Sequence, residues 1–195
     1  MRQLFLAPLL GIALALPAAA QPGPGFARLE VTVPGYPDGG EIPVEFSQAA
    51  PDAEPGGGTS PEITWAGAPE GTESFVVHFH DMNFVREATT EDQLHWLVWN
   101  IPGDSTGLPE GIESGNPLPD GSLQTSATGE VYRGPGAPAE GPFHHYVFEI
   151  YALDTVLDIE PQDDAFATRA EVLEAIQGHV IGKGVYTGLF KRPAE

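Results

Sequence analysis

The stretch of sequence that decides the fold is LHWLVWNI at residues 94–101. Apolar side chains occupy both odd and even positions of this run, which predicts a strand that is buried on both faces. Two further runs have the same character, SFVVHFH at 74–80 and HYVFEIYAL at 145–153. We expect all three runs to be central strands of a sheet.

Weaker strand patterns flank these runs. Apolar residues alternate with polar ones over 29–33 and again over 42–46, and strand character returns over 180–190. The 24 glycines and 20 prolines interrupt the apolar runs throughout the chain. This spacing favours a β-rich domain with long loops, which we expect at 51–60 and 102–142.

One segment predicts a helix. Thr168 followed by Glu171 forms a capping box, and an apolar stripe runs over 172–176. Gly178 then supplies a stop, because glycine is the usual residue just beyond a helix end. We therefore expect a helix that begins at Thr168.

The N-terminus has the pattern of a secretory signal peptide, residues 1–20. Arg2 precedes an apolar run over 4–16, and small residues close the segment, so we expect cleavage after Ala20. The run is too short for a membrane-spanning helix. The sequence thus predicts a periplasmic or secreted protein that does not span the membrane, with a single domain over 21–195.

Composition limits the classes of partner. The formal net charge is −20, from 28 acidic residues against 8 basic ones. Such a surface repels nucleic acid, which requires clustered Lys and Arg, so we exclude nucleic acid as a partner. The chain has no cysteine, which excludes disulfides and metal binding through sulfur.

Histidines near the apolar runs suggest two kinds of site. His78 and His80 lie two residues apart and share a strand face, so with His95 or a carboxylate they could hold a divalent metal ion. Alternatively, His95, His144 and backbone amides of the loop 134–136 could hold an anion, since imidazolium and turn amides both bind phosphate. We favour the anion site and expect no bound cofactor or metal.

Several motifs, taken in order, resemble the phosphatidylethanolamine-binding protein family, in its bacterial Raf-kinase-inhibitor-like branch of the YbhB/YbcL type. They are SPEITW at 60–65, PEGTESF at 69–75, HWLVWNIP at 95–102, YRGP at 132–135 and HHY at 144–146. The resemblance implies a mainly β fold, a β-sandwich in which a large central antiparallel sheet packs on a smaller one with one or two peripheral helices. It also implies a small cavity near one end of the sheet that accepts phosphate-like or carboxylate groups.

The resemblance also implies which residues bind the ligand. The matching positions are Asp81, His95, Gly134, Pro135, His144 and Tyr146. We expect Asp81 to orient an imidazole, because a carboxylate would oppose an anion directly. The family usually has Asp-Pro-Asp-Ala-Pro where this chain has DMNFV at 81–85, so we expect a reshaped loop beside the cavity.

These observations favour an exported protein that binds a small anionic ligand and has no catalytic activity. No serine has the context of a nucleophile elbow, and no close pair of carboxylates suggests hydrolysis of sugars. One alternative is an inhibitor of an extracytoplasmic protease or other enzyme, with a protein as its partner. A second alternative is a metal-dependent enzyme that uses His78, His80 and His95.

Overall fold

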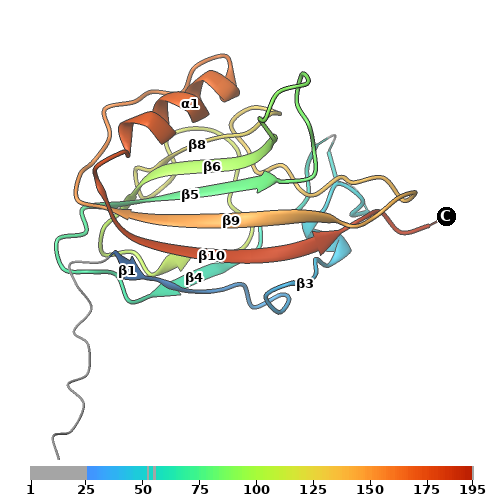
Figure 1. Cartoon of the computed structure of the whole chain (residues 1–195), viewed down its shortest axis with the longest axis horizontal. Coiled ribbons are helices and arrows are strands. Elements are labelled where there is room, and N and C mark those ends of the chain that lie inside the picture. Colours follow the sequence, from blue (N-terminus) through green and yellow to red (C-terminus); the bar gives the residue numbers. More distant parts are fainter. Residues whose placement is uncertain (1–25, 52, 55, 195) are drawn as a thin grey trace, which may run out of the picture.

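The protein is built mainly from two β-sheets (Figure 1). Its structure is a computed structural model that describes residues 26–51, 53–54 and 56–194. The expected signal peptide lies outside these residues. The large sheet has the strand order β1 (Ala27–Arg28), β10 (Val180–Phe190), β9 (His144–Leu153), β5 (Ser74–Asp81), β6 (Gln93–Pro102) and β8 (Leu123–Thr125), and β3 (Gly40–Glu41) also pairs with β10. The small sheet has the order β2 (Glu30–Thr32), β4 (Ile63–Ala66) and β7 (Gly107–Leu108).

The three runs predicted as central strands are the centre of the large sheet. β5 pairs with β6 on one side and β9 on the other, both antiparallel, and every residue of β5 is buried. The tail predicted over 180–190 is β10, which pairs with β9. The mainly β, two-sheet fold expected from the sequence is therefore confirmed.

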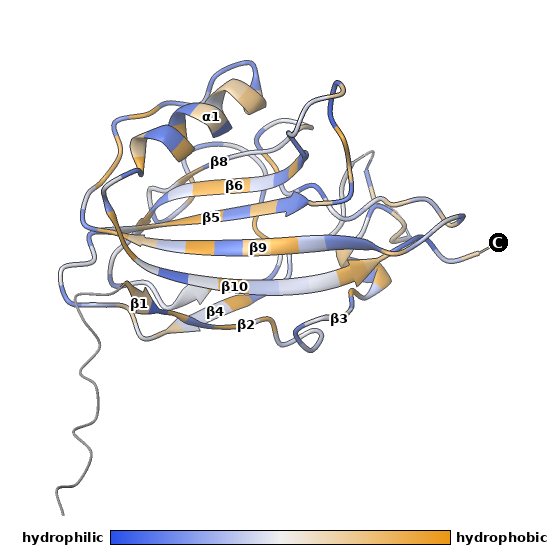
Figure 2. Ribbon diagram, viewed as in Figure 1, coloured by the Kyte–Doolittle hydropathy of each residue, from blue (hydrophilic) through white to orange (hydrophobic). Residues whose placement is uncertain are grey.

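Each face of the large sheet buries its own apolar cluster. One face carries an aromatic-rich cluster that includes Phe75, Phe79 and Phe148 and is completed by Trp65 of the small sheet. The other face packs Val76, Leu97 and neighbouring apolar residues against α1 (Ala165–Ala175). Figure 2 shows orange apolar segments along β5, β6 and β9 and mixed colouring on α1, as expected for a helix with one solvent-exposed side.

The helix exists, but the prediction that it begins at Thr168 was wrong. Its N-cap is Asp164, whose carboxylate accepts a hydrogen bond of 2.9 Å from the backbone N–H of Phe166. Thr168 is buried inside the helix, where its hydroxyl accepts from the N–H of Gln162. Gly178 has a φ of 87° just beyond the helix end, as expected for a stop signal. No helix in the described part of the chain is long and apolar enough to cross a membrane.

The alternating pattern at 42–46 does not form the expected strand. Gly40–Glu41 makes a two-residue strand on β10, and the short 3-10 helix η1 (Val44–Phe46) follows. Pro43 explains the change, because it has no N–H for a sheet and instead its carbonyl accepts from the N–H of Phe46 at 3.1 Å. The expected loop 102–142 likewise contains the short strands β7 and β8.

The small sheet lies very close to β10. A Cβ atom at Gly184 would lie 2.4 Å from Cγ2 of Val31 and 2.9 Å from Cβ of Leu29. Real Cβ atoms do not approach other atoms so closely, so this contact between the sheets requires glycine at 184.

Candidate functional site

A cavity of about 220 Å³ lies at the end of the large sheet where β5 ends and β6 and β9 begin. In Figure 1 this is the end toward which the β5 arrow points. Four of the six residues implied by the family resemblance line it, namely Asp81, His95, His144 and Tyr146. The register of the sheet brings them together, because Asp81 of β5 lies opposite Tyr146 of β9.

Asp81 holds the ring of His144. Its Oδ2 lies 2.7 Å from Nδ1 of His144, and its Oδ1 accepts from the N–H of Asn83 at 2.9 Å. A carboxylate only accepts hydrogen bonds, so Nδ1 carries the proton in this pair. The ring is thereby fixed, and Nε2 is left for a ligand. This arrangement is the orienting role that we expected for Asp81.

His95 is neutral, which corrects the expectation of an imidazolium at this position. Its ring is almost fully buried, and its Nδ1–H donates to the carbonyl oxygen of Arg133 at 3.0 Å. Burial lowers the pKa of His95 to about 4, with a smaller opposing effect from that carbonyl. At neutral pH the second nitrogen, Nε2, is therefore a hydrogen-bond acceptor rather than a donor.

Tyr146 occupies the amide of Gly136, one of the loop amides that we expected to bind an anion, and also the amide of the next residue. Its hydroxyl oxygen accepts from the N–H of Gly136 at 3.3 Å and from the N–H of Ala137 at 3.1 Å. Burial, together with the nearby Asp81 carboxylate, raises the pKa of Tyr146, so the hydroxyl keeps its proton. Because the hydroxyl oxygen already accepts two hydrogen bonds, the hydroxyl can interact with Asp81 or a ligand only by donating its proton.

Gly134 and Pro135 support the wall of the cavity from behind. The N–H of Gly134 donates to the carbonyl of Gly57 at 3.0 Å, and the Gly134 carbonyl accepts from the side chain of Gln48 at 2.7 Å. The Pro135 carbonyl accepts from the backbone of Gln48 at 2.9 Å. From this loop, residues 136–138 reach the cavity. The loop therefore contributes to the site at positions just beyond those implied by the resemblance.

Sequence reasoning missed Arg133, which also lines the cavity. Burial lowers the pKa of Arg133, but arginine stays cationic at neutral pH. Its buried Nε has no hydrogen-bond partner. The YRGP motif contained this residue, but only the Gly-Pro pair was taken from it. Gln48, Phe84 and Gln93 complete the lining. Phe84 belongs to the loop 81–85 that we expected beside the cavity, whereas Gln48 and Gln93 were missed.

A second polar cluster lies on the opposite face of β5. Successive strand residues point to opposite faces, so His78 and His80 face α1 while Phe79 and Asp81 face the cavity side. The two imidazole rings stack with centroids 4.3 Å apart and an interplanar angle of 2°. His95 packs against Phe79 instead, with centroids 5.6 Å apart. The three histidines of the metal hypothesis are therefore not brought together.

Glu149 of β9 joins His78 and His80 in this cluster. Burial lowers the pKa of His78. Burial also opposes charge on His80, but its hydrogen bond to Asp92 and the negative charges of Asp92 and Glu149 outweigh it and raise the pKa of His80 to about 9. Arg169 of α1 pairs with Asp92 at 2.8 Å and closes the cluster on the helix side.

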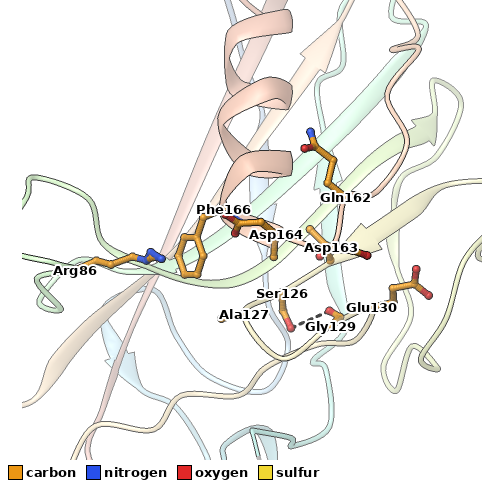
Figure 3. A pocket seen from close by; sticks show the side chains of 11 residues that line it. Arg86, Ser126, Ala127, Gly129, Glu130, Gln162, Asp163, Asp164 and Phe166 are labelled. Carbon is orange, nitrogen blue, oxygen red and sulfur yellow. Dashed lines mark hydrogen bonds between the residues drawn. The ribbon is translucent and has the colours of Figure 1, made fainter.

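A larger cavity, of about 430 Å³, lies between the turn after β8 and the start of α1. Figure 3 shows Arg86 stacked on the ring of Phe166, with its guanidinium carbon 3.6 Å from the ring centroid. Glu130, Asp163 and Asp164 also line this cavity. These carboxylates oppose an anion, so size alone does not make this cavity the ligand site.

Comparison with known proteins agrees with this architecture. The phosphatidylethanolamine-binding protein family model matches residues 32–191, which is most of the chain. The chain belongs to the phosphatidylethanolamine-binding protein family. A UPF0098 protein of Methanothermobacter thermautotrophicus is 39% identical over 159 residues, covering 80% of this chain and 95% of the relative.

Two Escherichia coli proteins extend this family relationship. YbhB is 36% identical over 138 residues, covering 69% of this chain and 83% of YbhB. The crystal structure of YbcL, described as a member of the mammalian phosphatidylethanolamine-binding protein family, superposes with a TM-score of 0.70 at 29% identity. The superposition covers 85% of this chain and 99% of the YbcL chain. The branch expected from the motifs is therefore confirmed.

Proposed function

We propose that this protein is a non-catalytic binding protein that holds the anionic, phosphate-like head group of a small ligand in the cavity between His95 and His144. The observation that carries the proposal is the Asp81–His144 pair, which leaves Nε2 of His144 for a ligand in a cavity also lined by Arg133. With Nδ1–H held by Asp81, the imidazolium form of His144 presents Nε2–H as a donor toward the cavity, and charge-assisted hydrogen bonds of this kind to phosphate oxygens are strong.

The neutral state of His95 supports a more specific ligand. Its Nε2 accepts a hydrogen bond, whereas Arg133 and the Tyr146 hydroxyl donate. A phosphate monoester at neutral pH has unprotonated oxygens that accept hydrogen bonds. In its singly charged form it also has one P–OH group that can donate. Sulfate presents oxygens only, and a buried acceptor left without a donor is costly. We therefore expect the cavity to prefer phosphate over sulfate.

The negative surface does not prevent such binding. At physiological ionic strength, charges are screened beyond about 8 Å. Arg133 lines the cavity together with the Asp81–His144 pair, so the local field there differs from that of the acidic exterior. We expect the formal net charge of −20 to lower the association rate of an anionic ligand more than it lowers the affinity of the complex.

Calorimetric titration with inorganic phosphate, phosphoethanolamine and sulfate tests the proposal. We expect phosphate and phosphoethanolamine to bind, sulfate to bind at least about 10-fold more weakly, and His144→Ala to remove binding of both phosphate probes. His145→Ala is the matched control, because His145 is the next residue of β9 and is exposed. Equal affinity of the wild type and His144→Ala would remove this cavity as the ligand site.

Export belongs to the same proposal. Residues 1–20 have the signal-peptide pattern, and the family match begins only at residue 32. We expect the mature protein to begin at Gln21, to form a single domain over 21–195, and to be periplasmic or secreted. Mass spectrometry of the protein from cell fractions tests this. Full-length protein found only in the cytoplasm would contradict it.

A second candidate function, inhibition of an extracytoplasmic enzyme, has support in the loop beside the cavity. Met82, Phe84 and Val85 are 60%, 45% and 67% exposed, and Phe84 also lines the cavity. Apolar side chains grouped on an exposed loop are typical of contact surfaces for proteins. Inhibition assays against extracytoplasmic proteases test this function, with Val85→Ser as the variant expected to lose inhibition and His144→Ala as the variant expected to keep it.

A further inference from the structure

We propose that His78, His80 and Glu149 form a binding site for one divalent transition-metal ion, with Zn²⁺ as the ion that suits it best. The site lies on the α1 face of β5 and is independent of the ligand cavity on the other face. One ligand atom from each of the three residues lies within 4.8 Å of the other two. Two imidazoles and one carboxylate are a ligand set that Zn²⁺ uses in proteins.

The distances within the cluster match a tetrahedral site. Oε2 of Glu149 lies 3.5 Å from Nδ1 of His78 and 3.6 Å from Nε2 of His80. Zinc bonds to nitrogen and oxygen are about 2.1 Å long, so two ligand atoms of a tetrahedral site lie roughly 3.4 Å apart. The observed separations are long for direct hydrogen bonds, and neither histidine nitrogen is satisfied by one.

The cluster also has the supporting hydrogen bonds of a metal site. His80 uses its other nitrogen, Nδ1, to donate to Oδ2 of Asp92 at 2.5 Å, and Asp92 is held in turn by Arg169 at 2.8 Å. A histidine that ligates a metal usually donates its second N–H to a carboxylate in this way. Tyr151 likewise donates to Oε2 of Glu149 at 2.8 Å, which orients the third ligand.

His78 is the ligand that is free to move. The two rings are parallel, so one of them must turn before the in-plane lone pairs of both can meet at one ion. Both ring nitrogens of His78 are buried without a hydrogen-bond partner, so turning this ring breaks no hydrogen bond. Buried polar atoms without partners are rare and costly, and an ion would satisfy one of them.

Access is also suitable, and Zn²⁺ replaces the second proton of His80, which is released to solvent on binding. His78 lines a cavity of about 310 Å³ together with Asp92 and Arg169, which offers an entry path and room for a water as the fourth ligand. Lys183 pairs with Oε1 of Glu149 at 2.5 Å, but its side chain is 40% exposed. It can turn into solvent when a cation binds, which leaves the carboxylate charge for the ion.

The test uses the full, untagged chain after treatment with a chelator, titrated with ZnCl₂ in a calorimeter. We expect saturable uptake of one ion per chain and at least about 10-fold weaker binding in His78→Gln and in Glu149→Gln. His179→Gln is the matched control, because His179 also pairs with a carboxylate, Asp154 at 2.8 Å, but is exposed. Uptake that is absent in the wild type, or unchanged in both ligand variants, would overturn the proposal.

Two further measurements keep the proposal falsifiable if the ligand variants do not fold. Cobalt added to the wild type should give the absorption of a tetrahedral site, whereas the spectrum of six-coordinate cobalt would overturn the proposal. His144→Ala, which alters only the ligand cavity, should bind zinc as the wild type does. Loss of zinc in His144→Ala would instead place the ion in that cavity and would also overturn the proposal.

Discussion

Replacing His95 with Gln should remove a defined part of the acid sensitivity of the fold. The pKa of His95 is about 4 in the folded protein and about 6.5 when the chain is unfolded. Between these pH values the unfolded state binds a proton that the folded state does not, so stability falls as the pH falls from 6.5 to 4. With these two pKa values, the buried neutral state of His95 lowers the free energy of unfolding by about 2 kcal/mol more at pH 4.5 than at pH 7.

Urea unfolding of the wild type and His95→Gln at several pH values between 7 and 4.5 measures this quantity. The glutamine amide can still donate to the Arg133 carbonyl, so the variant should lose less stability than the wild type over this range, by about 2 kcal/mol. His145→Gln changes an exposed histidine and should follow the wild type. If the His95→Gln and wild-type curves stay parallel, then His95 is not buried in its neutral form and the description of the cavity is wrong.

Three more substitutions test individual contacts, each measured by urea unfolding. Tyr146→Phe leaves the buried amide of Ala137 and the partly buried amide of Gly136 without their acceptor and should cost about 1–3 kcal/mol; a cost near zero would mean that water reaches those amides. Asp164→Ala removes the helix cap and should cost about 1 kcal/mol, and an unchanged midpoint would mean that Asp164 does not cap the helix. Gly184→Ala inserts a methyl group against Val31 and should cost about 1–3 kcal/mol, and an unchanged midpoint would mean that the small sheet can move away.

The central strands could be predicted because burial on both faces leaves a continuous apolar run in the sequence. The short strands β1, β3, β7 and β8 could not be predicted, because two or three residues are too few to show the alternation of apolar and polar side chains that marks a strand. The start of the helix was misplaced because Asp164 and Thr168 are both good caps in the same short segment. Only tertiary packing, which buries Thr168, decides between them.

For the site, strand alternation correctly placed His144 with Tyr146, and His78 with His80. The pairing of Asp81 with His144 depends on the register between β5 and β9, which no local pattern contains. The charge state of His95 was mispredicted because it depends on burial and on the backbone carbonyl of Arg133. Backbone acceptors of this kind are not visible in a list of side chains.

His80 and Asp81 are neighbours in β5, yet one belongs to the histidine–carboxylate cluster and the other to the ligand cavity. Inserting or deleting a single residue upstream in this strand would turn every following side chain to the opposite face. Asp81 would then enter the cluster, and an imidazole would enter the cavity. During evolution the two sites can therefore change independently by substitution, but a change of length within 74–81 alters both in one step.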